Sequence, residues 1–217
     1  MLRNSLIETL ESRRLLSAAI DADGVLVITG TSGKDRIIIA VSTDNTPTVQ
    51  VTVNGVTDDF KVSDFPAGIR VSAMGGKDKV AVDETNGPLT ANVTMYGGNG
   101  KDDLYGGSGN DKLDGGTGKD RIFGLGGNDR LIGWSGDDLL DGGAGNDYIT
   151  GNAGADDIVG GDGEDDLNGG GSHDNITGGA GNDDYIASDA ASERKDDGGG
   201  DNGDNSLADL VDQDPLS

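Results

Sequence analysis

Residues 97–186 consist of ten nine-residue segments that follow one another without any insertion. In order they read GGNGKDDLY, GGSGNDKLD, GGTGKDRIF, GLGGNDRLI, GWSGDDLLD, GGAGNDYIT, GNAGADDIV, GGDGEDDLN, GGGSHDNIT and GGAGNDDYI. The first position is Gly and the sixth is Asp in all ten, and the eighth is always apolar. A short and strictly kept period predicts a repeat architecture, in which each unit stacks on the next.

Each repeat is expected to form a six-residue turn followed by a three-residue strand. Because side chains alternate along a strand, the apolar eighth residue points inward while the seventh and ninth point outward. Two repeats then make one 18-residue coil with a strand on each side, and residues eighteen apart stack about 4.8 Å from each other. The predicted inward side chains are Leu104, Leu113, Ile122, Leu131, Leu140, Ile149, Ile158, Leu167, Ile176 and Tyr185.

The same stacking places the aspartates of the sixth position in two columns. Neighbouring carboxylates about 5 Å apart repel by roughly 1 kcal/mol in water, and by several at an effective dielectric constant near 20. A cation between adjacent turns reverses the sign of this interaction. Because the donors are hard oxygen atoms and the chain has no Cys and one His, the pattern favours Ca²⁺ over zinc or copper. The free energy of binding would then contribute to folding.

These residues resemble the RTX, or haemolysin-type, calcium-binding repeat G-G-x-G-x-D-x-U-x, in which U is a large apolar residue. The resemblance covers 90 of 217 residues. It implies an all-β fold, a right-handed parallel β-roll (a β-solenoid) with 18-residue coils. It also implies that each Ca²⁺ lies between adjacent turns on one side, bound by sixth-position carboxylates and by backbone carbonyls of the turns.

Carried onto this sequence, the resemblance implies a specific set of metal ligands. The carboxylate ligands are Asp102, Asp120, Asp138, Asp156 and Asp174 in one column and Asp111, Asp129, Asp147, Asp165 and Asp183 in the other. The implied backbone carbonyls are those of Gly98, Gly100, Gly107, Gly109, Gly116, Gly118, Gly127, Gly136, Gly143, Gly145, Gly154, Gly161 and Gly163. Four gaps between five turns on each side allow about eight calcium ions at most.

Some repeats depart from the pattern. The fourth position is Ser172 in the ninth repeat, and the second position is Leu125, Trp134 or Asn152 in three others. Because glycine is the residue that adopts positive φ without strain, we expect strain at Ser172. We also expect weaker or empty calcium sites near Asp174 and at the two ends.

The composition excludes several other classes of function. The chain contains 40 Gly, 33% apolar and 4% aromatic residues, and its formal net charge is −24. Such an acidic chain repels nucleic acid and bare anionic membranes. The sequence contains no run of eighteen apolar residues, so no membrane span is predicted. The single His173 and the serines form no pattern typical of a catalytic triad, so we expect no catalytic site.

Residues 21–96 are rich in short β-branched segments bounded by turn residues, which predict strands. Asn54-Gly55 between two such segments predicts a hairpin. Two pieces echo the later repeat, at residues 33–37 and 76–80, although their spacing is not a multiple of nine. This region is expected to form irregular, longer coils or a small sheet that leads into the array. A separate small β-sandwich is the alternative.

The two ends of the chain differ in character. Residues 1–20 contain a capping box from Ser5 to Glu8 that predicts a helix, and ETLESRRLLSA resembles the LEPR-x-LL sorting motif of many large secreted bacterial proteins. Glu11, Arg13, Leu15 and Leu16 carry this match, with Ser12 in place of Pro. The alternative is a helix that caps the open end of the solenoid. Residues 187–217 form an acidic tail that contains a decayed repeat.

Together these features predict a secreted, extracellular protein whose folding is driven by calcium. One class of alternative is an adhesin or cell-surface structural component, and another is the remnant of an RTX toxin or hydrolase. A candidate surface for a cell-surface or protein partner is an outward apolar stripe. The side chains of this predicted stripe are Tyr105, Phe123, Leu139 and Val159.

Overall fold

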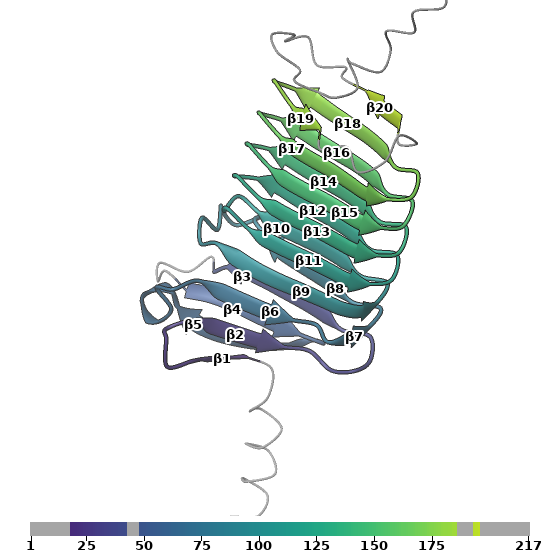
Figure 1. Cartoon of the computed structure of the whole chain (residues 1–217). Coiled ribbons are helices and arrows are strands. Elements are labelled where there is room, and N and C mark those ends of the chain that lie inside the picture. The colour runs from purple at the N-terminus through teal and green to yellow at the C-terminus, as the bar shows by residue number, and fades with distance from the viewer. Residues whose placement is uncertain (1–17, 43–47, 186–192, 196–217) are drawn as a thin grey trace, which may run out of the picture.

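Each turn of the chain contributes one strand to each of two sheets, which face each other across a single core (Figure 1). This computed structural model describes residues 18–42, 48–185 and 193–195. Within them almost every strand is paired in parallel with the strand one coil away. The sequence-based prediction of a parallel β-roll is therefore confirmed.

The first sheet runs in the order β1-β2-β6-β9-β11-β13-β15-β17-β19, with β7 also paired to β9. Its strands are β1 (Ala18–Ile20), β2 (Leu26–Thr29), β6 (Ile69–Ser72), β7 (Gly75–Gly76), β9 (Val93–Gly100), β11 (Lys112–Thr117), β13 (Arg130–Ser135), β15 (Tyr148–Ala153), β17 (Asp166–Gly171) and β19 (Asp184–Tyr185).

The second sheet runs in the order β20-β18-β16-β14-β12-β10-β8-β3-β4-β5. Its strands are β3 (Arg36–Val41), β4 (Thr48–Val53), β5 (Val56–Lys61), β8 (Lys79–Asp83), β10 (Asp103–Gly107), β12 (Arg121–Gly126), β14 (Leu139–Ala144), β16 (Asp157–Asp162), β18 (Asn175–Ala180) and β20 (Glu193–Lys195). A short 3₁₀ turn, η1 (Val62–Asp64), follows β5.

The register within the array is eighteen residues, as the period predicts. Leu113 lies opposite Leu131, and Leu131 lies opposite Ile149. The strands are longer than expected, however, because pairing continues from the seventh position of one repeat to the third position of the next. The glycines at the first and second positions cause this difference, since they let the backbones of adjacent coils stay close enough to keep their hydrogen bonds.

The core lies between the two sheets and consists of apolar side chains that both sheets contribute. All ten predicted inward residues of the array are buried, with exposed fractions of 0 to 9%. Tyr185, at the last inward position, also accepts a hydrogen bond through its hydroxyl from the N–H of Gly178, at 3.1 Å. The same core continues without a break into the leading region through residues such as Met95, Val71 and Ile28.

The leading region extends both sheets with two longer coils. Strand β8 pairs with β10 at an offset of 24 residues, since Lys79 lies opposite Asp103. Strand β3 pairs with β8 at an offset of 43, since Arg36 lies opposite Lys79. The excess length of the first coil holds the hairpin β4–β5, whose Asn54-Gly55 turn has φ of 51° and 84°. These angles suit the hairpin turn predicted from the two residues.

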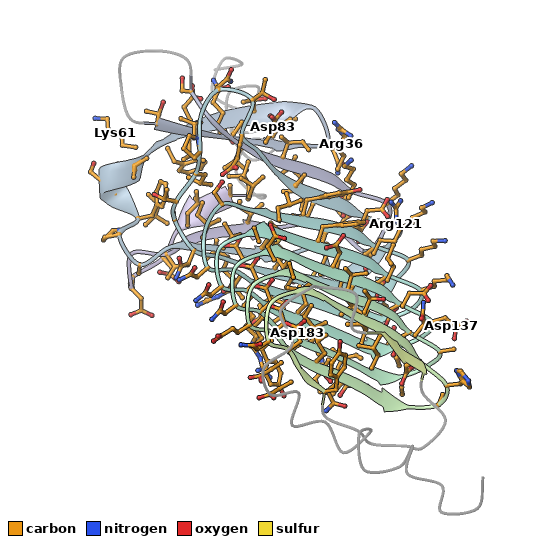
Figure 2. The ribbon with its side chains drawn as sticks, turned by 90° about the horizontal axis from the view of Figure 1, so that it is seen from above. Arg36, Lys61, Asp83, Arg121, Asp137 and Asp183 are labelled. Carbon is orange, nitrogen blue, oxygen red and sulfur yellow. The ribbon has the colours of Figure 1, made fainter. Side chains whose placement is uncertain are left out.

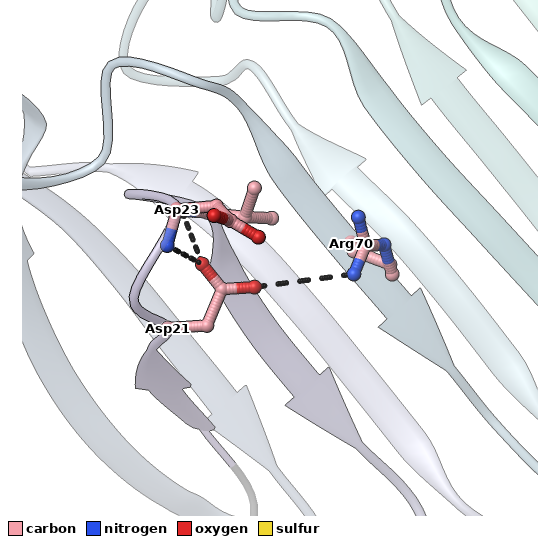
Figure 3. Close-up of polar contacts among 4 residues, drawn as sticks. Asp21, Asp23 and Arg70 are labelled. Carbon is pink, nitrogen blue, oxygen red and sulfur yellow. Dashed lines mark hydrogen bonds and ion pairs between the residues drawn. The ribbon is translucent and has the colours of Figure 1, made fainter.

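The first described residues form a strand rather than a helix. Ala18–Ile20 pairs antiparallel with β2. The Asp21 carboxylate fixes the turn between them, because its Oδ1 accepts the N–H groups of Asp23 and Val25, and its Oδ2 lies 3.9 Å from Arg70 of β6 (Figure 3). The rest of the expected N-terminal helix or sorting motif, residues 1–17, lies outside the described residues.

The acidic tail also lies largely outside the described residues, together with its decayed repeat. The short strand β20 pairs in parallel with β18. Among the helices of the described residues, none is long and apolar enough to cross a membrane.

Candidate metal centre

The ten sixth-position aspartates lie inside the turns rather than on the surface. They are between 0 and 6% exposed. Each one directly precedes a strand whose second residue points into the core, so alternation along the backbone turns the aspartate inward as well. Ionised carboxylates are almost never buried without partners, so the partners of these groups decide what the site can do.

One oxygen of each carboxylate has a backbone partner one coil earlier. In the first column the N–H of Asp102 donates to Oδ1 of Asp120 at 2.8 Å, and the N–H of Asp120 donates to Asp138 at 2.7 Å. In the second column the N–H of Asp111 donates to Oδ1 of Asp129 at 2.7 Å. The pattern repeats to Asp174 and Asp183. The structure thus brings the predicted residues together in the two predicted columns.

The second oxygen of most of these carboxylates is buried and has no hydrogen-bond donor among the described residues. The Oδ2 atoms concerned belong to Asp102, Asp111, Asp120, Asp129, Asp138, Asp147, Asp156 and Asp165. A buried acceptor without a partner costs about 1–3 kcal/mol, and more when it is charged. A regular row of such atoms fits a bound cation far better than it fits a bare protein core.

Backbone carbonyls surround the same turns. A Cβ atom added to Gly118 would collide with the carbonyl oxygen of Gly100, and one added to Gly116 would collide with that of Gly98. The predicted carbonyls that face a glycine one coil later in this way are those of Gly98, Gly100, Gly109, Gly118, Gly127, Gly136, Gly143, Gly145, Gly161 and Gly163. The remaining three, Gly107, Gly116 and Gly154, precede coils that carry Leu125, Trp134 and Ser172 at the equivalent positions.

The oxygen donors are therefore distributed along columns instead of gathered in clusters. No group of three or more His, Asp or Glu side chains that could hold a metal occurs among residues 18–42, 48–185 and 193–195. A cation between two turns would have to combine few carboxylates with several backbone carbonyls. Oxygen-only donor sets of this kind suit Ca²⁺, which accepts six to eight oxygen ligands in flexible geometry.

Burial raises the pKa of the eight sixth-position carboxyl groups from Asp102 to Asp165 above the usual value of 3.8. The pKa rises to about 7 for Asp120 and Asp129, mainly because burial penalises the charged form and in part because neighbouring aspartates repel it. Asp156 and Asp165 behave alike, while the pKa rises to about 6 at Asp102, Asp111 and Asp147. The backbone N–H donors oppose the rise without cancelling it.

These shifts predict that the calcium-free chain gains β-structure as the pH falls from 8 to 5. Protons bind the native carboxyl groups more tightly than the unfolded ones, so stability rises as the pH falls through about 7 and is fully gained below about 4. Far-UV circular dichroism in calcium-depleted buffers measures the change. A β signal that stays constant or declines between pH 8 and pH 5 would contradict this prediction.

Two buried aspartates extend the first column but were not among the predicted ligands. The N–H of Asp78 donates to Oδ1 of Asp102 at 2.8 Å, and the N–H of Asp35 donates to Oδ1 of Asp78 at 2.7 Å. The sequence contains their signal, because Gly33-Lys34-Asp35-Arg36-Ile37 and Gly76-Lys77-Asp78-Lys79-Val80 echo the repeat. Asp35 and Asp78 are 43 residues apart, and Asp78 and Asp102 are 24 residues apart. Because neither spacing is eighteen, the sequence did not place these residues in the column.

The side chains before the aspartates of the second column form a further ladder. The N–H of Asn128 donates to the side-chain oxygen of Asn110 at 2.8 Å, and the N–H of Asn146 donates to that of Asn128 at 2.9 Å. These exposed asparagines connect one coil to the next beside the buried aspartates. The first column carries Lys101 and Lys119 at the corresponding positions, so the two columns differ in local charge.

Four residues of the array adopt the left-handed conformation without being glycine. They are Leu125, Trp134, Asn152 and Ser172, with φ of 80°, 76°, 72° and 95°. The strain predicted for the turn before Asp174 is therefore present in the backbone at Ser172. Whether that strain weakens calcium binding there stays a prediction.

Replacing Ser172 by Gly should raise the free energy of unfolding by about 1 kcal/mol, because glycine adopts this φ without the cost of a Cβ atom. Thermal unfolding in calcium detects the gain. Ser135→Gly is the matched control, since Ser135 lies in β13 without a positive φ, and it should lower stability instead. A loss of stability in Ser172→Gly would show that the hydroxyl matters more than the backbone.

The predicted outward apolar stripe is wrong in its composition. Along the second sheet Tyr105 lies opposite Phe123, but Phe123 lies opposite Asp141, which separates it from Val159. Leu139 lies opposite Arg121 in the neighbouring row, because it occupies the seventh position of its repeat rather than the ninth. The remaining pair, Tyr105 and Phe123, is stacked with ring centroids 5.0 Å apart.

Comparison with known protein families identifies the array. Residues 90–113, 114–149 and 150–185 match the family model of the RTX calcium-binding nonapeptide repeat. Residues 90–185 are RTX calcium-binding repeats. Neither the curated proteins nor the solved structures compared with the chain gave a match. The repeats therefore support calcium as the ion and the β-roll as the fold.

Proposed function

We propose that this chain is an extracellular calcium-binding protein whose RTX β-roll folds when Ca²⁺ binds between its stacked turns. The observation that carries the proposal is the row of buried Oδ2 atoms without donors. The proposed carboxylate ligands are the ten sixth-position aspartates, and the turn glycines supply carbonyl oxygens. When bound, Ca²⁺ would supply the positive charge that compensates these buried carboxylates.

Three kinds of residue contribute to folding in different ways. The apolar eighth residues hold the two sheets together, and the glycines let the turns approach. The aspartates oppose that approach until they are neutralised, because burial penalises their charge. Folding and ion binding are thereby coupled, so that the free energy of one contributes to the other. The sixth-position carboxylates are buried and accept backbone N–H groups along two columns. This arrangement supports a binding role rather than a catalytic one.

The proposed location outside the cell follows from the expected affinity. Extracellular calcium modules bind with dissociation constants of about 10⁻⁴–10⁻³ M, which would leave the roll unfolded at low intracellular calcium. RTX repeat proteins are typically secreted. Residues 1–20 would then serve as a sorting segment, whereas residues 21–96 and 97–186 would respond to calcium together because they share one core.

Isothermal titration calorimetry of the chelator-treated chain tests the proposal. We expect Ca²⁺ to bind at several sites, about eight at most in the array. Mg²⁺ should bind far more weakly, because it demands a small octahedral site and dehydrates reluctantly. Equal binding of the two ions, or one calcium ion per chain, would contradict the proposal.

A second candidate function is contact with a negatively charged cell-surface component. A groove of about 420 Å³ on the second sheet is lined by Arg36, Lys79, Asp83, Glu84, Tyr105 and Leu125, among others. Lys79 lies 4.7 Å from the centre of the Tyr105 ring, and Arg121 lies 5.5 Å from that of Phe123. Figure 2 shows Arg36 and Arg121 projecting along one edge of the stack. Arg36 and Lys79, the latter over an aromatic ring, are the features of this groove that support an anionic partner.

Retention on an immobilised acidic polysaccharide in the presence of calcium tests this second function. Tyr105→Asp should reduce retention, because Tyr105 lines the groove and carries Lys79 over its ring. Tyr148→Asp is the matched control, because Tyr148 lies on the first sheet and also carries a cationic side chain over its ring, Arg130 at 4.4 Å. Equal retention of both variants and the unaltered chain would show that the groove has no such role.

A further inference from the structure

The first aspartate column continues beyond the part of the chain that matches the RTX repeat. Asp78 precedes the matched segments, which begin at residue 90. Its side chain is 1% exposed, and its Oδ2 has no hydrogen-bond donor among the described residues. In both respects Asp78 resembles Asp102, the first aspartate of the array, which is 0% exposed.

The turn around Asp78 is built like a turn of the array. The N–H of Asp103 donates to the carbonyl of Asp78 at 2.9 Å, just as the N–H of Arg121 donates to that of Asp102 at 2.8 Å. Gly76 lies opposite Gly100 in β7–β9, and its carbonyl oxygen faces Gly100 as that of Gly100 faces Gly118. The carbonyl of Gly33 faces Gly76 in turn.

Asp35, one coil earlier, is built differently. Both of its oxygens accept hydrogen bonds: Oδ2 accepts the N–H and the hydroxyl of Thr31 at 2.6 and 3.0 Å, and Oδ1 accepts the side-chain amide of Asn54 at 2.5 Å. Asn54 belongs to the hairpin turn that is inserted only in this coil. Neutral donors of the protein therefore compensate the last carboxylate, where a cation would otherwise be needed.

We infer that Asp78 is a ligand of an additional calcium ion in the leading region, and that Asp35 is a hydrogen-bonded end cap that binds none. The inference rests on the proposed function, since it extends the same kind of site. Ala73 and Met74 stand at the first and second positions, where most repeats of the array have glycine, so this turn departs from the repeat although Gly76 and Asp78 keep its fourth and sixth positions. Calcium would then order the leading coils as well as the array.

Native mass spectrometry of the calcium-loaded chain tests the inference by counting bound ions. Asp78→Asn should remove one ion relative to the unaltered chain, as Asp102→Asn should within the array. Asp35→Asn should leave the count unchanged while it lowers thermal stability. An unchanged count in Asp78→Asn, or a reduced count in Asp35→Asn, would overturn the inference. An unaltered chain that binds no calcium would instead overturn the proposed function itself, and this inference with it.

A measurement on the unaltered chain makes the test independent of whether the variants fold. Anomalous diffraction from calcium-grown crystals should show an ion at the Oδ2 atom of Asp78 and none at Asp35. Ions confined to the array would overturn the inference while they support the proposed function.

Discussion

Gly118→Ala is expected to prevent the roll from forming a cooperative fold, even in saturating calcium. Gly118 has a φ of 140°, which side chains rarely adopt, and the carbonyl oxygen of Gly100 occupies the place of the added Cβ atom. The obstacle is backbone, so no side-chain rotation relieves it. We expect a loss of more than about 3 kcal/mol, from the steric overlap and the left-handed backbone together.

Gly87→Ala separates these two causes. Gly87 has a similar φ of 131°, but no atom lies within 4 Å of an added Cβ. This variant should lose only the conformational part, about 1–2 kcal/mol. Far-UV circular dichroism in saturating calcium shows whether each variant folds, and thermal unfolding gives the loss of stability of any variant that does. Equal losses would show that the close approach of the coils contributes nothing to the requirement for glycine in the array.

Asp129→Asn is expected to change stability in opposite directions with and without calcium. The amide keeps the oxygen that accepts the N–H of Asp111 at 2.7 Å, but it removes a buried charge whose pKa is raised to about 7. Without calcium at pH 8, the variant should therefore be more stable, by on the order of a few kcal/mol. With calcium it should need at least about tenfold more ion to fold, since 1.4 kcal/mol corresponds to a factor of ten.

Asp162→Asn controls for the general effect of reducing the negative charge. Asp162 is exposed at the third position of its repeat, so its substitution should leave the calcium midpoint nearly unchanged. Circular dichroism in chelator between pH 8 and pH 5 measures the first effect in both variants, because the calcium-free chain gains β-structure in that range. Calcium titrations at pH 8 measure the second effect. If Asp129→Asn shifted the two states in the same direction, its carboxylate would have only a structural role.

The sequence predicted the array because every local signal in it agrees. The period of nine, the inward residues such as Leu104 and the columns of Asp102 and Asp111 all follow from side-chain alternation and stacking. The strands were predicted to be too short, because a turn rich in glycine was expected to end the pairing between coils. The structure shows that Gly116 and its neighbours continue it.

The leading region was harder to predict because its coils vary in length. The hairpin β4–β5 adds residues between Asp35 and Asp78 without disturbing the column, so the spatial period persists where the sequence period is lost. The neighbours of outward side chains were also harder to predict. Residues at the seventh and ninth positions of a repeat both point outward, but they lie in different rows across the sheet. Leu139 and Phe123 occupy different rows for that reason, although both face solvent on the same sheet.

If Ca²⁺ drives folding, the roll exists only while calcium is bound. Far-UV circular dichroism of the full chain at pH 8, recorded in excess chelator and again after calcium is restored, tests it most directly. We expect a spectrum without β-structure in chelator and a strong β signal after calcium is added, with no such recovery after magnesium. A strong β signal that persists in excess chelator at pH 8 would contradict it.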